Sequence, residues 1–125
     1  MVRILVIDDE NNIRLLYKEE FQDEGYEVLV AASAEEGLEK IRNNKPDIVT
    51  LDIKMPGEDG IELMRKLKEE ESDIPVVLCT AYGGFKRDFR VWASDAYVVK
   101  SADLTELKNV VRQILGKKYR DLTPA

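Results

Sequence analysis

The sequence contains no histidine among its 125 residues. This absence excludes serine–histidine–aspartate and cysteine–histidine catalysis, zinc sites built on histidine, and a phosphohistidine on this chain. The single cysteine, Cys79, excludes an internal disulfide and suits a reduced, cytoplasmic setting. No apolar run approaches the ~20 residues of a membrane span, and the N-terminus has the pattern of a strand rather than of a signal peptide.

Positively charged residues are also fewer than negatively charged residues. The chain carries 19 lysines and arginines against 25 aspartates and glutamates, a formal net charge of −6. Such a chain has no overall field that would draw it to nucleic acid or to anionic lipid, so we expect neither direct DNA binding nor membrane binding. Its length fits one domain of ordinary size. The chemistry available to it rests on carboxylates, hydroxyls and lysines.

Two apolar runs end on acidic residues. Ile4–Ile7 is followed by Asp8 and Asp9, and Ile48–Leu51 is followed by Asp52. Runs that are nearly continuous in valine, isoleucine and leucine are typical of strands buried on both faces of a sheet. Taken alone, Asp52 could simply cap the turn after its strand. Two such strands, each delivering acid at its carboxyl end, indicate a shared site.

Apolar runs alternate with helical periodicity along the chain. Ser33 and Glu36 form a capping box, Gly25 is expected to close the first helix, and Gly116 the last. We predict a flavodoxin-like α/β fold, a doubly wound five-stranded parallel sheet of order 2-1-3-4-5 with helices on both faces. We expect one domain over residues 1–116 with a short tail over 117–125. The expected strands are 3–7, 27–31, 47–52, 76–79 and 96–99; the expected helices are 11–24, 33–43, 61–71, 85–92 and 105–116.

This strand order predicts where the acids meet. In open α/β sheets, ligands bind beyond the carboxyl ends of the strands, where the strand order reverses. Here the reversal lies between the first and third strands, which end in Asp8, Asp9 and Asp52. The fourth strand adds Thr80 and the fifth adds Lys100 to the same rim. One rim is therefore expected to hold three carboxylates, a hydroxyl and a lysine.

These residues give the chain a family resemblance over nearly its whole length, up to Gly116. It resembles the receiver domain of bacterial two-component response regulators, and among them the stand-alone, single-domain regulators of phosphorelays and chemotaxis. The matching motifs, in order and on the expected elements, are Val6-Ile7-Asp8-Asp9, Leu51-Asp52-Ile53-Lys54-Met55-Pro56-Gly57, Asp59-Gly60, Thr80-Ala81 and Tyr97-Val98-Val99-Lys100.

The resemblance implies a phosphoacceptor. Asp52 would take the phosphoryl group as an aspartyl phosphate, and Asp8 and Asp9 would hold Mg²⁺ together with Asp52 and the backbone carbonyl of Lys54. Physical chemistry agrees, because clustered carboxylates repel one another and a hard divalent cation relieves that repulsion. An ionised aspartate is also a feasible nucleophile for this transfer.

The resemblance assigns further residues to switching and to lifetime. Thr80 would bind the phosphoryl group, Lys100 would pair with it, and Tyr97 would be the aromatic that changes rotamer. Lys54 and Tyr82 would flank the path of the water that removes the phosphoryl group. Taken singly, Thr80 could be a strand-end residue, Lys100 a solvated charge and Tyr97 a core residue.

The resemblance also implies partners. The phosphodonor would be a sensor histidine kinase or a histidine phosphotransfer protein. A downstream protein would bind the short fourth helix, the fifth strand and the last helix, where Phe85, Phe89 and Trp92 form either a contact patch or core. Three departures from the family fall on this face: Ser101 follows Lys100 where proline is usual, the segment from Thr80 to Lys100 is shorter than usual, and Trp92-Ala93-Ser94 replaces a common Leu-Gly-Ala turn.

Three alternatives remain open from the sequence. A pseudo-receiver would keep the fold as a protein-binding module without regulated phosphorylation, although Asp9, Asp52 and Lys100 are all present. A metal-dependent phosphatase acting on an external substrate would be expected to carry a second acid two residues after the nucleophile, where this chain has Lys54. The chain could also be the detached receiver of a longer regulator.

Overall fold

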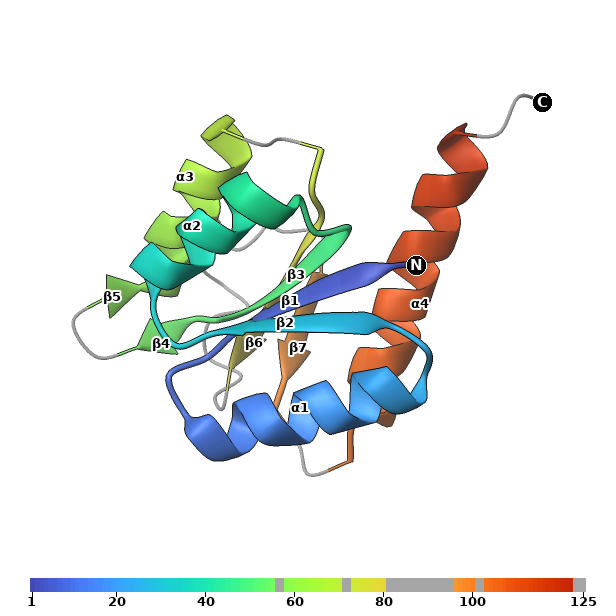
Figure 1. Ribbon diagram of the computed structural model, residues 1–125, viewed down its shortest axis with the longest axis horizontal. Coiled ribbons are helices and arrows are strands. Elements are labelled where there is room, and N and C mark those ends of the chain that lie inside the picture. The colour runs from blue at the N-terminus through green and yellow to red at the C-terminus, as the bar shows by residue number, and fades with distance from the viewer. Residues whose placement is uncertain (56–57, 71–72, 81–95, 101–102, 123–125) are drawn as a thin grey trace.

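A five-stranded parallel sheet forms the centre of the computed structural model, which describes residues 1–55, 58–70, 73–80, 96–100 and 103–122 (Figure 1). The strand order is β2-β1-β3-β6-β7, and every neighbouring pair is parallel. This confirms the predicted 2-1-3-4-5 order. The strands are β1 (Arg3–Ile7), β2 (Glu27–Ala31), β3 (Ile48–Asp52), β6 (Val76–Thr80) and β7 (Ala96–Val99).

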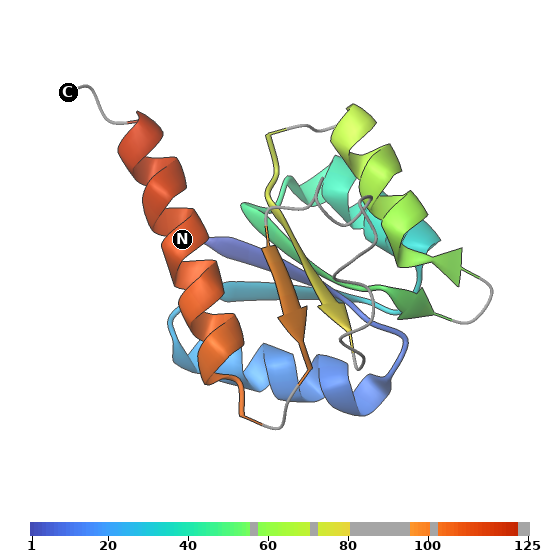
Figure 2. The same ribbon diagram turned by 180° about the vertical axis from the view of Figure 1, so that it is seen from behind.

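Four helices among the described residues cover the two faces of this sheet. They are α1 (Asn11–Asp23), α2 (Ala34–Asn44), α3 (Gly60–Glu70) and α4 (Thr105–Leu122). Figures 1 and 2 show α2 and α3 on one face and α1 and α4 on the other. None of the helices within the described ranges is long and apolar enough to cross a membrane.

The alternation of side chains along the strands divides the core into two layers. In β3, Val49 and Leu51 face the layer that α2 and α3 cover, whereas Ile48 faces the layer that α1 and α4 cover. All five residues of β3 and of β6 are buried. Burial of both sheet faces explains why these strands appear in the sequence as continuous apolar runs.

Two predicted helix ends are built as expected. Ser33 is the N-cap of α2, and its hydroxyl accepts a hydrogen bond from the Glu36 N–H at 3.2 Å. The Glu36 carboxylate accepts in turn from the Ala32 N–H, one residue before the usual position. After α1, Gly25 adopts a φ of 94°, a conformation that costs little for glycine. Its N–H donates to the Gln22 carbonyl, which ends the helix.

Two sequence predictions about element bounds were wrong. The last helix does not stop at Gly116 but continues to Leu122, and its final turns extend past the sheet (Figure 1). A single exposed glycine inside a helix costs only about 1 kcal/mol, too little to end it by itself. Residues 53–60, in which no strand or helix was expected, contain a short antiparallel pair, β4 (Lys54–Met55) and β5 (Glu58–Asp59).

Some predictions fall outside the described residues. The short helix expected over 85–92, with Phe85, Phe89 and Trp92, lies there, as do Tyr82 and Ser101.

Two backbone features of α2 are tightly constrained. Lys45, which follows the helix, has a φ of 45°, in the left-handed region that non-glycine residues rarely adopt. Gly37 lies against β1 so closely that an added Cβ would be 2.5 Å from Cδ1 of Ile7. A larger residue at position 37 would therefore require the Ile7 side chain or the helix to shift.

Candidate functional site

The parallel register brings the acids together. Ile7 pairs with Leu51 across β1 and β3, so the next residues, Asp8 and Asp52, lie side by side at the carboxyl end of these strands. Asp52 also pairs with Cys79 of β6, which places Thr80 next along the same rim. The sheet thus assembles the predicted residues by backbone pairing alone.

Three carboxylates form a compact cluster at this rim. One oxygen from each of Asp8, Asp9 and Asp52 lies within 4.8 Å of the others. Asp8 is 2% exposed and Asp52 is 5% exposed, whereas Asp9 is more accessible. Buried carboxylates at this spacing strongly favour a nearby positive charge.

Lys100 supplies positive charge from the end of β7. Its Nζ lies 2.7 Å from Asp8 Oδ2 and 3.4 Å from Asp52 Oδ2, and its backbone N–H donates to the Thr80 carbonyl at 2.6 Å. Burial alone would lower the pKa of Lys100, but the hydrogen bond to Asp8 and the charges of Asp8 and Asp52 raise it overall. The ammonium therefore stays charged at neutral pH and binds two of the three acids.

Asp8 is fixed at each of its polar groups. Its N–H donates to the Ala31 carbonyl at 3.1 Å, and its Oδ1 accepts from the Glu10 N–H at 3.0 Å. Its Oδ2 accepts from Lys100, and its backbone carbonyl accepts from Arg14 Nη1 at 2.7 Å. Asp8 is thus held by neighbours from β2, β7 and α1.

Arg14 was not predicted as a site residue from the sequence. This residue lies in the first turns of α1, and its second arm, Nη2, is 3.3 Å from Asn11 Oδ1. The available signal was a basic residue shortly after the acidic pair, but a long side chain that binds a backbone carbonyl leaves no periodic pattern in a sequence.

The charges of Asp8 and Asp52 also influence the pKa values of two further buried groups, Cys79 and Tyr17. Burial raises the pKa of the Cys79 thiol to about 12, with Lys100 acting in the opposite direction. Burial also raises the pKa of Tyr17, on α1, with smaller contributions from Cys79 and Asp8. Both groups are therefore neutral at physiological pH and add no charge to the site.

The acid cluster suits a small hard cation. Mg²⁺–oxygen bonds of about 2.1 Å place opposite ligand oxygens about 4.2 Å apart. The cluster, within 4.8 Å, is close to that size, and its donors are all oxygen. Asp8, Asp9 and Asp52 could therefore hold a metal ion after a small inward movement.

The remaining predicted residues are placed as follows. Thr80 is buried at the end of β6, and Tyr97 lies half-buried on β7, packed against the layer that α2 and α3 cover. The backbone of Lys54 lies in β4, directly after the acid-bearing strand. Tyr82 is outside the described residues.

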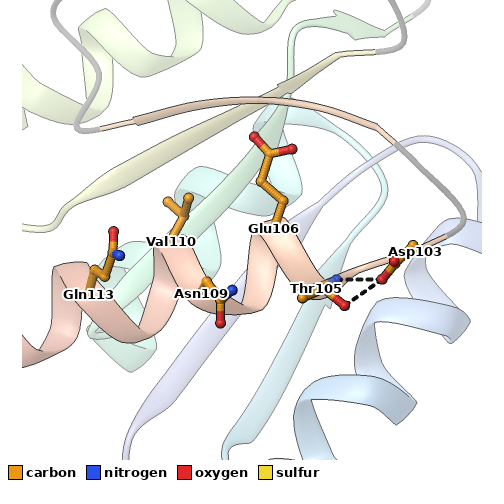
Figure 3. Close-up of a pocket in the computed structure, with 6 residues that line it drawn as sticks. All are labelled: Asp103, Thr105, Glu106, Asn109, Val110 and Gln113. Atoms are coloured by element: carbon orange, nitrogen blue, oxygen red, sulfur yellow. Dashed lines mark hydrogen bonds between the residues drawn. The ribbon is translucent and has the colours of Figure 1, made fainter.

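An open cavity of about 560 Å³ lies along α4, and none of Asp8, Asp9 and Asp52 lines it. Figure 3 shows Glu106, Val110 and Gln113 projecting from the same side of this helix. Asp103 accepts hydrogen bonds from the N–H and hydroxyl of Thr105 at the start of the helix. The cavity is lined by Asp103, Thr105, Glu106, Asn109, Val110 and Gln113.

Comparison with known proteins gives a consistent result. The family model of the response regulator receiver domain matches residues 4–112. Sporulation initiation phosphotransferase F of Bacillus subtilis is 34% identical over 118 residues, which cover 93% of this chain and 95% of that protein.

Two solved structures of one relative are also similar. The response regulator TrrA from Thermotoga maritima, in complex with Mg²⁺-BeF, has a TM-score of 0.87 and 47% identity, covering 90% of this chain and 98% of that chain. The same regulator in complex with the histidine kinase ThkA has a TM-score of 0.86 and 47% identity, covering 92% of this chain and 99% of that chain.

Proposed function

Because the chain belongs to the response regulator receiver family, we propose that Asp52 accepts a phosphoryl group from a phosphohistidine on a partner protein in a reaction that depends on Mg²⁺. The observation that carries this proposal is the cluster of Asp8, Asp9 and Asp52 beside the ammonium of Lys100. A pseudo-receiver is not favoured, because every acid and the lysine are present and adjacent.

The transfer begins with Asp52. One of its carboxylate oxygens attacks the phosphorus, the phosphorus–nitrogen bond breaks, and the imidazole of the partner leaves with the electron pair. Lys100, 3.4 Å from Asp52, is suited to pair with an oxygen of the transferring group. When bound by the three acids, Mg²⁺ supplies further positive charge to the phosphoryl oxygens.

The transfer leaves a doubly charged group at the end of β3, and its neighbours are suited to respond. Thr80 follows Cys79, the β6 partner of Asp52, so its hydroxyl is suited to bind the new oxygens. Tyr97, one strand further, would then change rotamer and alter the surface of β7. In this way, a local change in charge would shift the equilibrium between two packing arrangements.

The partners follow from the same reasoning. The phosphodonor is proposed to be a histidine kinase or a histidine phosphotransfer protein, supported by the ThkA–TrrA complex of a relative. The downstream partner is proposed to be a protein that binds the face carrying β7 and α4, where the open cavity lies. With a net charge of −6, this chain is not expected to shift duplex DNA in a mobility-shift assay.

The deciding experiment is phosphorylation by acetyl phosphate, followed by intact mass measurement. Wild-type protein should gain one phosphoryl group with Mg²⁺ and none in EDTA, and Asp52→Asn should gain none. Asp23→Asn, at the far end of α1, is the matched control and should be labelled like wild type. Labelling of Asp52→Asn would place the acceptor elsewhere, and no labelling of wild type would favour a pseudo-receiver.

A further inference from the structure

The two metal-site acids on the β1–α1 turn are held very differently. Asp8 has a partner for each of its polar groups, including both carboxylate oxygens. Asp9 is more accessible, and the described residues show no such anchoring of its side chain. The peptide group that joins Asp9 to Asp8 is therefore a group through which the position of Asp9 can be constrained.

Arg14 binds that peptide group. Its Nη1 donates to the Asp8 carbonyl oxygen at 2.7 Å, and this oxygen belongs to the Asp8–Asp9 peptide plane. Its Nη2 contacts Asn11 Oδ1 at 3.3 Å, so both arms of the guanidinium bind the turn. The Arg14 N–H also donates to the Glu10 carbonyl at 3.1 Å, which fixes the residue at the start of α1.

We propose that Arg14 is a positioning residue for the cation site, holding the Asp8–Asp9 peptide so that the Asp9 carboxylate stays beside Asp8 and Asp52. This inference rests on the proposed function, in which those three acids bind Mg²⁺. The planar fork of an arginine is needed, because a lysine presents one point charge and cannot bind a carbonyl and an amide oxygen in fixed geometry.

Positioning and charge predict opposite effects on metal affinity. A guanidinium bound to the backbone carbonyl of Asp8 repels a dication held by the carboxylates, so removing its charge should by itself tighten Mg²⁺ binding. Loss of positioning should weaken binding, since groups that orient metal ligands typically contribute 10- to 100-fold to affinity. The direction of the change in a neutral variant therefore separates the two roles.

The test is Mg²⁺ titration by calorimetry at fixed ionic strength. We expect Arg14→Met and Arg14→Lys each to weaken Mg²⁺ binding about tenfold. Asn11→Ala, which removes one contact of the fork, should cause a smaller loss in the same direction. Arg112→Met removes the same charge from an arginine that binds Glu24 at the opposite end of α1, and should bind Mg²⁺ like wild type. Thermal unfolding without Mg²⁺ checks that each variant is folded.

The outcomes are distinguishable. Absence of Mg²⁺ binding by wild type would overturn the metal site, and this inference with it. If wild type binds Mg²⁺ and Arg14→Met binds it equally well or more tightly, the proposed role of Arg14 is overturned. The metal site itself is not overturned by that result. If Arg14→Met does not fold, weakened binding by Asn11→Ala and Arg14→Lys supports the inference, and unchanged binding by both overturns it.

Discussion

The buried thiol of Cys79 gives the protein a measurable dependence of stability on pH. Its pKa is about 12 in the folded protein, against an ordinary value of about 8.5. Above pH 8.5 the unfolded chain loses a proton that the folded protein keeps. The free energy of unfolding should therefore fall as pH rises, by up to about 1.4 kcal/mol per pH unit.

Urea unfolding of wild type and Cys79→Ala measures this effect. The stability advantage of wild type over the variant should shrink by about 2 kcal/mol between pH 8 and pH 10. Other titrating groups are common to both proteins and cancel in the difference, apart from the smaller contribution of Cys79 to the raised pKa of Tyr17. A constant difference across this range would contradict the burial of the thiol as the source of the shift.

Lys54 and Tyr82 are predicted to prolong the phosphorylated state. By resemblance, both flank the approach of the water that attacks the aspartyl phosphate, and their long side chains should crowd it. Neither is suited to be a general base at neutral pH, because lysine is protonated and tyrosine has a pKa near 10. Lys54→Asn and Tyr82→Ala should each speed the decay of phosphorylated protein, up to about tenfold, or ~1.4 kcal/mol of barrier.

The matched control for lifetime is Lys66→Asn, an exposed lysine on α3. It should leave the decay rate unchanged. Decay of both variants at the wild-type rate would show that water reaches the phosphoryl group by another path.

The site residues differ in how far the sequence could predict them. Asp8 and Lys100 follow strands and Asp52 ends one, so the parallel order of the strands predicted their common rim. Arg14 could not be predicted, because its contact depends on where a long side chain ends in space. The identity of a residue that binds a backbone carbonyl carries no information about which carbonyl it reaches.

At the scale of the elements, the backbone conformation of Lys45 lowers the stability of the protein. Its left-handed conformation at the end of α2 costs about 1 kcal/mol or more for a residue with a side chain. Lys45→Gly should therefore stabilise the protein by roughly 1 kcal/mol. Lys40→Gly, inside the same helix, should destabilise it by a similar amount, and urea unfolding measures both. The same sign for both variants would refute the argument.

Because Gly37 contacts β1, a larger residue at position 37 should lower the stability of the protein. A second substitution, in β1, should recover part of that stability. Gly37→Ala should gain helix propensity, but its new Cβ would meet Ile7 Cδ1 at 2.5 Å in a fully packed core. We expect a net loss of about 1–3 kcal/mol. Ile7→Val removes that atom, so the double variant should be more stable than Gly37→Ala alone. A double-mutant cycle without positive coupling would show that the helix moves away instead.

Two glycines show why the sequence predicted one helix end and not the other. After Gly25 comes Tyr26, whose N–H donates to the Phe21 carbonyl and whose ring lies 6.0 Å from that of Phe21. This apolar contact closes the chain back onto the helix. After Gly116 come Lys117 and Lys118, which offer no apolar contact of this kind. The glycine permits an ending, and the residue after it decides whether one forms.

At the scale of the whole molecule, Mg²⁺ should stabilise the fold. A ligand that binds only the folded state adds about 2.7 kcal/mol at one hundred times its dissociation constant. Wild type should therefore gain stability in urea as Mg²⁺ is added, and Asp9→Ala should gain much less because a charged ligand is lost. Asp23→Ala serves as the control. An equal gain in Asp9→Ala would exclude Asp9 as a ligand.

The repulsion among Asp8, Asp9 and Asp52 is a local energetic cost that natural selection has retained. With all three carboxylates ionised, the cluster and Lys100 together carry a formal charge of −2 inside a largely buried rim. A sequence chosen for stability alone would replace at least one of these acids by a neutral residue. In β3 the buried Thr50 hydroxyl also lacks a hydrogen-bond partner among the described residues, but it carries no charge. The acids at this rim are therefore retained for a reason other than the stability of the fold.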